Sequence, residues 1–274
     1  MSGFGFEVAS PEEGLLNIKH TILVMSGKGG VGKSFITVNT AAILASHGSR
    51  VGILDADIHG PSVPKMLGID HMRLIAPDPG QSLKPLIGPN NIKVISIAFL
   101  LPTYDTPVVW RGPLKAKAIQ EFVENLDWGE LDYLLVDLPP GTGDEPLSVA
   151  QEIRKPSGTI IVTIPSEVSQ IVVEKAVNFA FSLKIPIIGI VENMSGFTCP
   201  ESGKTYKIFG EGGGERIAKR MKVPFLGKIP LDPRIAEASD KGKLFTLSYP
   251  DAPASKALNE IVKRIKQFLE QSNK

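Results

Sequence analysis

The sequence predicts a single doubly wound α/β domain, in which helices cover both faces of a mostly parallel β-sheet. Short segments rich in Val, Ile and Leu alternate with longer segments of helical periodicity along the 274 residues. The strand segments are apolar at successive positions, which is typical of strands buried on both faces. Because no linker, repeat or low-complexity stretch divides the chain, residues 1–274 are predicted to form one domain, with residues 1–18 as an N-terminal extension.

The predicted strands are short apolar runs bounded by glycine, proline or charged residues. Two of them, "VGILDAD" and "LDYLLVD", end in aspartates, and a third, "TILVM", leads into a glycine-rich loop. Because ligands of parallel sheets bind at the carboxyl ends of strands, these ends mark the expected site. In chain order the predicted strands are Thr21–Met25, Val51–Asp57, Ile92–Leu100 and Leu131–Asp137, followed by runs within 158–165, 185–194 and 223–230.

The predicted helices have apolar residues three and four positions apart. Pro113 suits the first turn of one of them, since that position needs no N–H donor. Residues 60–89 are rich in proline and glycine and are predicted to be loops with a short helix near Val63–Leu67. The other helices are predicted at about Ser34–Ser46, Pro113–Leu126, Glu167–Leu183, Gly214–Met221 and 254–271.

Charge and composition exclude several classes of protein. A net charge of +1 gives no electrostatic reason to expect binding of nucleic acid or of an anionic membrane. A single cysteine, Cys199, excludes an intrachain disulfide and indicates a reducing compartment. No apolar run approaches the ~20 residues of a membrane span, and the first residues lack the pattern of a signal peptide. We therefore expect a cytoplasmic enzyme or switch.

The stretch "GKGGVGKS", residues 27–34, matches the phosphate-binding pattern G-x-x-x-x-G-K-[ST] between a predicted strand and a predicted helix. Its glycines let backbone N–H groups surround phosphates, and the helix N-terminus attracts anions. Lys33 would neutralise phosphate charge, and the Ser34 hydroxyl would bind Mg²⁺. Nucleotide binding is therefore predicted for Gly27, Lys28, Gly29, Gly30, Val31, Gly32, Lys33 and Ser34.

Acidic residues at two other strand ends complete the expected site. Asp137 follows four apolar residues, as in a Walker B strand, and would lie beside the Mg²⁺. Asp55 and Asp57 are two residues apart and so lie on the same side of an extended segment. One could hold Mg²⁺-bound water while the other orients the attacking water. The glycine-rich stretch 137–144 that follows is well placed to respond to a γ-phosphate.

The additional lysine, Lys28, makes "GKGGVGKS" resemble the deviant Walker A motif of the ParA/MinD/nitrogenase-iron-protein ATPases. Three further stretches, "DADIHGPS", "DLPPGTGD" and "VENMSGF", resemble the Mrp/ApbC branch, whose members are scaffolds or carriers in iron–sulfur cluster assembly. The resemblance runs from about Lys19 to Lys243. It implies a homodimeric P-loop NTPase that binds ATP and Mg²⁺, hydrolyses ATP slowly and delivers clusters to apo iron–sulfur client proteins.

The resemblance also implies individual roles. Lys28 would reach across the dimer interface to the partner's ATP and stabilise charge on the transferred phosphoryl group. Asp57 would position the hydrolytic water. Asn193 would hydrogen-bond the adenine ring, and the alternative for this residue is a capping or turn asparagine. The implied catalytic residues are Lys28, Lys33 and Asp57, and the implied Mg²⁺ site comprises Ser34, Asp55 and Asp137.

The sequence departs from that family at the cluster site. Members carry C-x-x-C just after the "NMSGF" segment, and two such pairs hold a [4Fe–4S] cluster across the dimer interface. Here Cys199 is present but Ser202 replaces the second cysteine, and a serine is a poor ligand for iron. Three alternatives follow: a labile cluster bridged by two Cys199 thiolates and external ligands, a substitution carried by this sequence, or a family member that left cluster chemistry and kept the ATPase. A lone cysteine could also be a small buried hydrophobe.

The main rival hypothesis is a nucleotide-gated positioning or scaffold ATPase, similar to MinD and ParA, that carries no metal. Relatives of that kind end in a basic amphipathic helix that binds membrane, and residues 254–271 have an apolar stripe with basic residues beside it. A helix docked on its own domain has the same pattern, and we expect that arrangement rather than membrane binding. The four histidines show no metal-ligand spacing, and only His59 lies in a functional segment.

Overall fold

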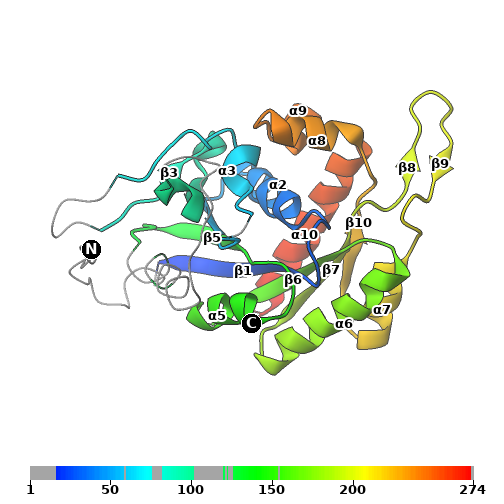
Figure 1. The fold of residues 1–274 in the computed structure, drawn as a ribbon, viewed down its shortest axis with the longest axis horizontal. Helices are drawn as coiled ribbons and strands as arrows, with labels where there is room; N and C mark the ends of the chain where they lie inside the picture. The colour runs from blue at the N-terminus through cyan, green and yellow to red at the C-terminus, as the bar shows by residue number, and fades with distance from the viewer. Residues whose placement is uncertain are drawn as a thin grey trace.

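An eight-stranded sheet forms the centre of the protein, with the strand order β10-β7-β6-β1-β5-β2-β4-β3 (Figure 1). The computed structural model describes residues 17–58, 60–75, 82–101, 120, 122, 126–153 and 155–272. Every neighbouring pair is parallel except β3 and β4. The strands are β1 (Ile18–Ser26), β2 (Val51–Asp55), β3 (Leu86–Ile87), β4 (Lys93–Ser96), β5 (Leu131–Asp137), β6 (Gly158–Thr163), β7 (Ile187–Glu192) and β10 (Phe225–Lys228).

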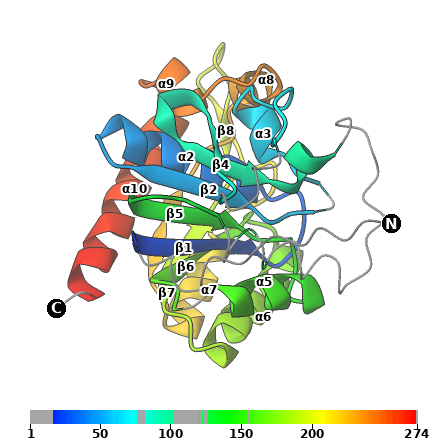
Figure 2. The same ribbon diagram turned by 90° about the vertical axis from the view of Figure 1, so that its left-hand side faces the viewer.

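Helices pack on both faces of this sheet, as Figures 1 and 2 show. Alternate residues of β1 point to opposite faces: Ile22 and Val24 join one buried cluster, and Leu23 and Met25 join the other. The first cluster is shared with α2 (Lys33–Ser46), α3 (Val63–Met66), α8 (Pro233–Asp240), α9 (Phe245–Ser248) and α10 (Pro253–Ser272). The second is shared with α5 (Asp144–Glu152), α6 (Glu167–Ser182) and α7 (Gly213–Met221). The predicted fold class is confirmed.

One predicted strand is wrong in part. Ile92–Leu100 was expected to be continuous, but β4 ends at Ser96 and the chain continues as a short 3₁₀ helix, Ile97–Leu100. The Ser96 hydroxyl accepts a hydrogen bond from the N–H of Ala98 and so caps the turn. Nearly all of the predicted helix Pro113–Leu126, His59, and residues 1–16 of the N-terminal extension lie outside the described residues.

The last helix, α10, uses its apolar stripe inside the domain. Leu258, Ile265 and Leu269 are buried in the cluster shared with α2. The guanidinium of Arg264 donates a hydrogen bond of 2.8 Å to the carbonyl of Leu226 in β10. Among the residues that the structure describes, no helix is both long and apolar enough to cross a membrane.

A small two-stranded ribbon, β8 (Phe197–Thr198) and β9 (Thr205–Tyr206), projects from the body after β7 (Figure 1). Residues 200–210 of this hairpin are all exposed. This hairpin could not be predicted from the sequence, because each strand has only two residues and neither has an apolar run.

Candidate functional site

The phosphate-binding loop follows β1 and opens α2. Gly30 and Gly32 have φ angles of 76° and 85°, in the left-handed region that favours glycine. Gly32 is the N-cap of α2, and no side chain caps the free N–H groups of the first turn. A Cβ at Gly29 or Gly30 would meet no atom within 4 Å, so the loop is open on its outer side. The loop therefore offers uncapped N–H groups and open space to an anion.

Asn193 closes the inner side of this loop. Its buried amide donates a 2.9 Å hydrogen bond from Nδ2 to the carbonyl of Val31. A Cβ built on Gly32 would lie 2.2 Å from that Nδ2. This hydrogen bond favours the capping or turn interpretation of Asn193, because the side chain supports the loop at Val31. Its amide oxygen accepts no hydrogen bond from the described residues, and contact with an adenine ring through that oxygen stays a prediction.

Gly32→Ala is expected to destabilise the protein by about 1–2 kcal/mol from backbone strain alone, with further loss from the contact with Asn193. Urea denaturation measures the change. Gly29→Ala is the matched control, because its added Cβ meets nothing within 4 Å. Adding Asn193→Ala to Gly32→Ala should recover the part of the loss caused by the contact. Equal stability of the two glycine variants would contradict the described loop geometry.

Asp137, at the end of β5, is the centre of the site. It is fully buried, and its Oδ2 lies 2.9 Å from the ammonium of Lys33. The Ser34 hydroxyl donates to the same oxygen at 2.6 Å, and the Thr37 hydroxyl donates to Oδ1 at 2.7 Å. The ammonium contacts Asp137 as an ion pair without hydrogen-bonding geometry, and no other described acceptor reaches it. Lys33 is therefore held at the loop with hydrogen-bonding capacity to spare.

Asp55 lies beside Asp137, because β2 and β5 pair in register at these two residues. Its Oδ2 accepts a hydrogen bond of 3.0 Å from Ser96. Burial, reinforced by the nearby charge of Asp137, raises the pKa of Asp55 well above its ordinary value. Oxygen ligands such as Ser34, Asp55 and Asp137 suit a hard cation like Mg²⁺. A bound cation would oppose the burial and the repulsion from Asp137 that raise this pKa.

The raised pKa of Asp55 predicts a pH dependence of stability in the nucleotide-free protein. The folded state binds this proton more tightly than the unfolded state, so the contribution is fully present below about pH 4 and is lost as pH rises through the folded-state pKa. Urea melts between about pH 4 and about pH 8 measure this loss as the pH trend of the parent minus that of Asp55→Asn, because carboxyl groups with lowered pKa values add an opposite trend to both proteins. Asp132→Asn is the control, because Arg50 lowers the pKa of that surface carboxylate. Equal pH trends in the parent and in Asp55→Asn would contradict the assignment.

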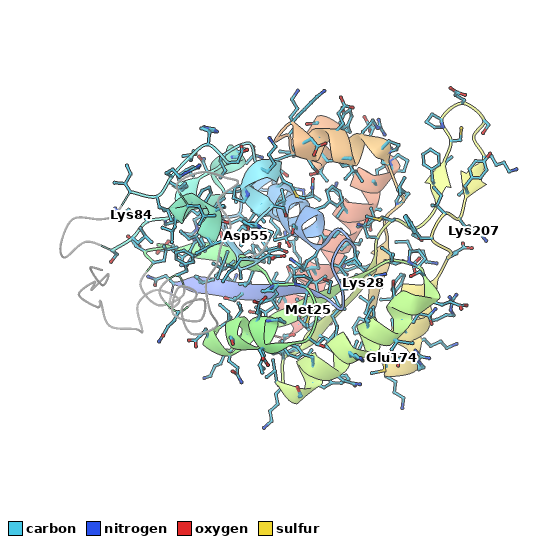
Figure 3. The ribbon with its side chains drawn as sticks, in the orientation of Figure 1. Met25, Lys28, Asp55, Lys84, Glu174 and Lys207 are labelled. Carbon is cyan, nitrogen blue, oxygen red and sulfur yellow. The ribbon has the colours of Figure 1, made fainter. Side chains whose placement is uncertain are left out.

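Lys28 and Asp57 are less constrained than Asp137. Lys28 is partly exposed beside the end of β1 (Figure 3), and its side chain has no carboxylate partner among the described residues. Its backbone carbonyl accepts a 2.9 Å hydrogen bond from Ser26. Asp57 is partly buried, and its Oδ1 accepts a 3.2 Å hydrogen bond from the N–H of Gly60. Both side chains are therefore available to other groups.

The predicted cluster ligand, Cys199, lies at the turn of the β8–β9 hairpin. Its backbone N–H donates to the carbonyl of Lys204, and its carbonyl accepts from Gly203. Hydrogen bonds from the Ser202 hydroxyl, and from the backbone N–H groups of Ser202 and Glu201, lower the pKa of the thiol. Cys199 is partly exposed rather than buried, so it is not a packing residue. Within the described parts of the chain, no group of three or more His, Cys, Asp or Glu side chains could hold a metal.

Two further residues of the site, Thr37 and Ser96, were not predicted from the sequence. Thr37 follows Lys33 by one helical turn, so the helical spacing places it on the same side of α2, facing Asp137. Ser96 lies at the end of β4, which neighbours β2, and it pairs in register with Asp55. The spacing of Thr37 is a usable signal in the sequence. The contact of Ser96 with Asp55 could be predicted only if the neighbouring positions of β2 and β4 in the sheet were known.

Comparison with known proteins agrees with this geometry. A family model described as ParA, NUBPL iron-transfer P-loop NTPase, matches residues 17–266. The chain is 55% identical over 254 residues to the "Iron-sulfur cluster carrier protein" of Saccharolobus solfataricus, covering 93% of this chain and 85% of that protein. It is 42% identical over 270 residues to "Cytosolic Fe-S cluster assembly factor CFD1" of Saccharomyces cerevisiae, covering 95% and 92%.

A solved structure is similar over most of the chain. The nucleotide-binding protein of Archaeoglobus fulgidus, determined in complex with ADP, superimposes with a TM-score of 0.76 at 44% sequence identity. The match covers 86% of this chain and 91% of that one. The phosphate-binding loop and the aspartates at neighbouring strand ends agree with these similarities. The chain belongs to the ParA family of P-loop NTPases, in the group described as NUBPL iron-transfer proteins.

Proposed function

We propose that this protein is a homodimeric, Mg²⁺-dependent ATPase that carries an iron–sulfur cluster at its dimer interface and transfers it to apo client proteins in the cytoplasm. The observation that carries the proposal is the environment of Cys199. Its thiol is partly exposed on a projecting hairpin, and neighbouring donors lower its pKa. The thiolate is the form that binds iron.

The relatives favour a cluster carrier over a positioning ATPase without metal. Both curated relatives have names that refer to iron–sulfur clusters, at 55% and 42% identity. The yeast relative is also named as cytosolic, which supports the proposed compartment. The similar structure from Archaeoglobus fulgidus was determined with ADP, which supports an adenine nucleotide at the phosphate-binding loop.

The residues of the phosphate-binding loop divide the work of hydrolysis between two subunits. Lys33 would move from Asp137 toward phosphate oxygens, and Ser34 with Asp137 would hold the Mg²⁺ that neutralises phosphate charge. Lys28, which has no carboxylate partner in the described part of its own chain, would reach the phosphates bound by the other subunit. Asp57 would orient the attacking water. Loss of the γ-phosphate would then release the closed dimer. A slow turnover would suit a switch of this kind.

Replacement of the second cysteine makes a labile cluster the favoured alternative. A symmetric dimer supplies two Cys199 thiolates, whereas a [4Fe–4S] cluster takes four cysteine ligands. Ser202 donates a hydrogen bond to the Cys199 sulfur, so the serine stabilises the one thiolate that each subunit supplies. External thiols would complete the ligand set. A cluster held by only two protein thiolates would leave readily, as the work of a carrier requires.

Anaerobic reconstitution with iron, sulfide and glutathione tests this proposal. The protein is expected to gain visible absorption from thiolate-to-iron charge transfer, and Cys199→Ala is expected to gain none. Ser202→Cys should bind the cluster at least ~10-fold more tightly, because two added thiolates replace exchangeable ligands. The readout is iron retained after desalting. Absence of iron from the parent protein, or equal retention by Cys199→Ala, would exclude the carrier function.

A further inference from the structure

Glu192, the last residue of β7, has an environment that the proposed chemistry does not use. Its carboxylate is fully buried, and no described cation forms an ion pair with it. It accepts three hydrogen bonds instead. Oε1 accepts from the Ser195 hydroxyl at 2.6 Å and from the N–H of Gly212 at 3.1 Å, and Oε2 accepts from the N–H of Gly214 at 2.7 Å. Both oxygens of the buried Glu192 carboxylate therefore accept hydrogen bonds from uncharged donors.

These donors lie at the two ends of the segment that forms the Cys199 hairpin. Ser195 precedes β8, whereas Gly212 and Gly214 follow β9 and begin α7. Glu192 therefore ties the start of this segment to its end. Glycines make the approach possible: a Cβ on Gly213 would lie 2.3 Å from the carbonyl oxygen of Pro165, and one on Gly214 would lie 3.1 Å from the Cβ of Glu192.

The hairpin has few other attachments to the body. Residues 200–210 are exposed, and a bridge between Phe197 and Leu231 lies at its base. The N–H of Leu231 donates to the carbonyl of Gly196 at the same level. Two short paired strands are marginally stable in water without further support. The orientation of Cys199 therefore depends on how the base of the hairpin is held.

The neighbour of Glu192 contacts the nucleotide site. Asn193 donates to the Val31 carbonyl in the phosphate-binding loop at 2.9 Å. Successive side chains of an extended segment point in opposite directions. Two adjacent residues thus contact the phosphate-binding loop on one side and the base of the Cys199 hairpin on the other.

We propose that Glu192 is a positioning residue that, together with Asn193, fixes the Cys199 hairpin relative to the phosphate-binding loop and so transmits nucleotide binding to Cys199. This inference rests on the proposed function, because it assumes that nucleotide acts on a cluster-binding thiol. The two residues are consecutive in the chain, so a shift of the loop at Val31 displaces Asn193 and, with it, the carboxylate that orients the hairpin.

Glu192→Gln tests the link while keeping the size of the side chain. An amide has one acceptor atom, so its NH₂ group would face a backbone N–H of Gly212 or Gly214 and at least one hydrogen bond would be lost. Glu211→Gln is the matched control, since Glu211 adjoins Gly212 but its carboxylate is exposed and pairs with Lys207. Because the chain has a single cysteine, alkylation by iodoacetamide reports on Cys199 alone.

Alkylation rates are compared without nucleotide and with Mg²⁺–ATP. The parent and Glu211→Gln are expected to react at least fivefold more slowly with ATP, and Glu192→Gln is expected to lose most of that difference while its ATP affinity changes less than twofold. An ATP response in Glu192→Gln equal to that of the parent overturns the inference. No ATP response in the parent itself instead contradicts the nucleotide-gated cycle of the proposed function.

Amide hydrogen exchange gives a second readout that needs no nucleotide. Glu192→Gln should increase exchange in residues 196–211 at least tenfold and leave β1 and α2 at parental rates. Ser195→Ala removes one hydrogen bond of the three and should give a smaller increase, which guards against general unfolding of the stronger variant. Unchanged exchange in residues 196–211 of both variants would show that Glu192 does not hold the hairpin.

Discussion

Lys28→Ala is expected to reduce kcat for ATP hydrolysis by about 10³-fold or more while nucleotide affinity changes by less than about threefold. The basis is the partly exposed position of Lys28, which has no carboxylate partner in the described part of its own chain. A cation supplied by a neighbouring subunit, similar in effect to an arginine finger, contributes ~10³–10⁵ in rate to phosphoryl transfer. Phosphate release and calorimetric titration with ADP separate the two effects.

Lys33→Ala is the matched comparison for Lys28→Ala. The Lys33 ammonium is buried and bound to Asp137, so its loss should weaken both nucleotide binding and hydrolysis. Mixing Lys28→Ala with Asp57→Ala subunits should restore part of the activity if each lysine serves the opposite site, because one of the two mixed sites then has both groups. Hydrolysis by Lys28→Ala at the parental rate would exclude the role across the interface.

Asp137→Asn is expected to abolish hydrolysis and to lower the unfolding free energy by about 3–5 kcal/mol, because it leaves the Lys33 ammonium buried without its counter-charge. Asp137 is fully buried and binds three side chains of α2, so no solvent compensates for its loss. Urea denaturation of the nucleotide-free protein measures the change in stability.

Two comparisons isolate the ion pair. Asp251→Asn removes an exposed carboxylate 3.8 Å from Lys256 and should change stability by less than about 1 kcal/mol. Lys33→Met combined with Asp137→Asn should lower the unfolding free energy by less than the sum of the two single substitutions. The double variant removes both charges, so neither is left buried without a partner. Additive losses would mean that Lys33 and Asp137 do not stabilise each other.

Much of the fold followed from local patterns in the sequence. Strands such as β6 and β7 are continuous apolar runs, and a sheet covered on both faces is the arrangement that buries them. The phosphate-binding loop was also predictable, since the glycines at 30 and 32 fix its backbone at positive φ. Features that depend on residues distant in sequence but close in space could not be predicted in this way. The end of β4 at Ser96, for example, is set by a cap and by a hydrogen bond to Asp55 in the next strand.

In the site, too, contacts set by local sequence were predictable and contacts between distant segments were not. Lys33, Ser34 and Asp137 lie in contact because the end of β5 and the start of α2 bring them together. The hydrogen bond from the Asn193 amide to the Val31 carbonyl joins segments 162 residues apart and was not predicted, whereas contact of Asn193 with an adenine ring stays a prediction. Glu192 was missed, because a glutamate at the end of an apolar strand is usually a solvated residue, and only the folded chain shows its three donors.

In the proposed function, ATP controls the release of a cluster bound through Cys199. The most direct test is cluster transfer from the anaerobically reconstituted protein to an apo [4Fe–4S] acceptor, followed by the acceptor's activity, with Mg²⁺–ATP or Mg²⁺–ADP present. Transfer from the parent is expected to differ at least fivefold between the two nucleotides. Lys28→Ala is expected to remove this difference, and Cys199→Ala is expected to transfer nothing. Transfer at the same rate with both nucleotides would contradict control of the cluster by ATP. Transfer from Cys199→Ala equal to that from the parent would contradict binding of the cluster through Cys199.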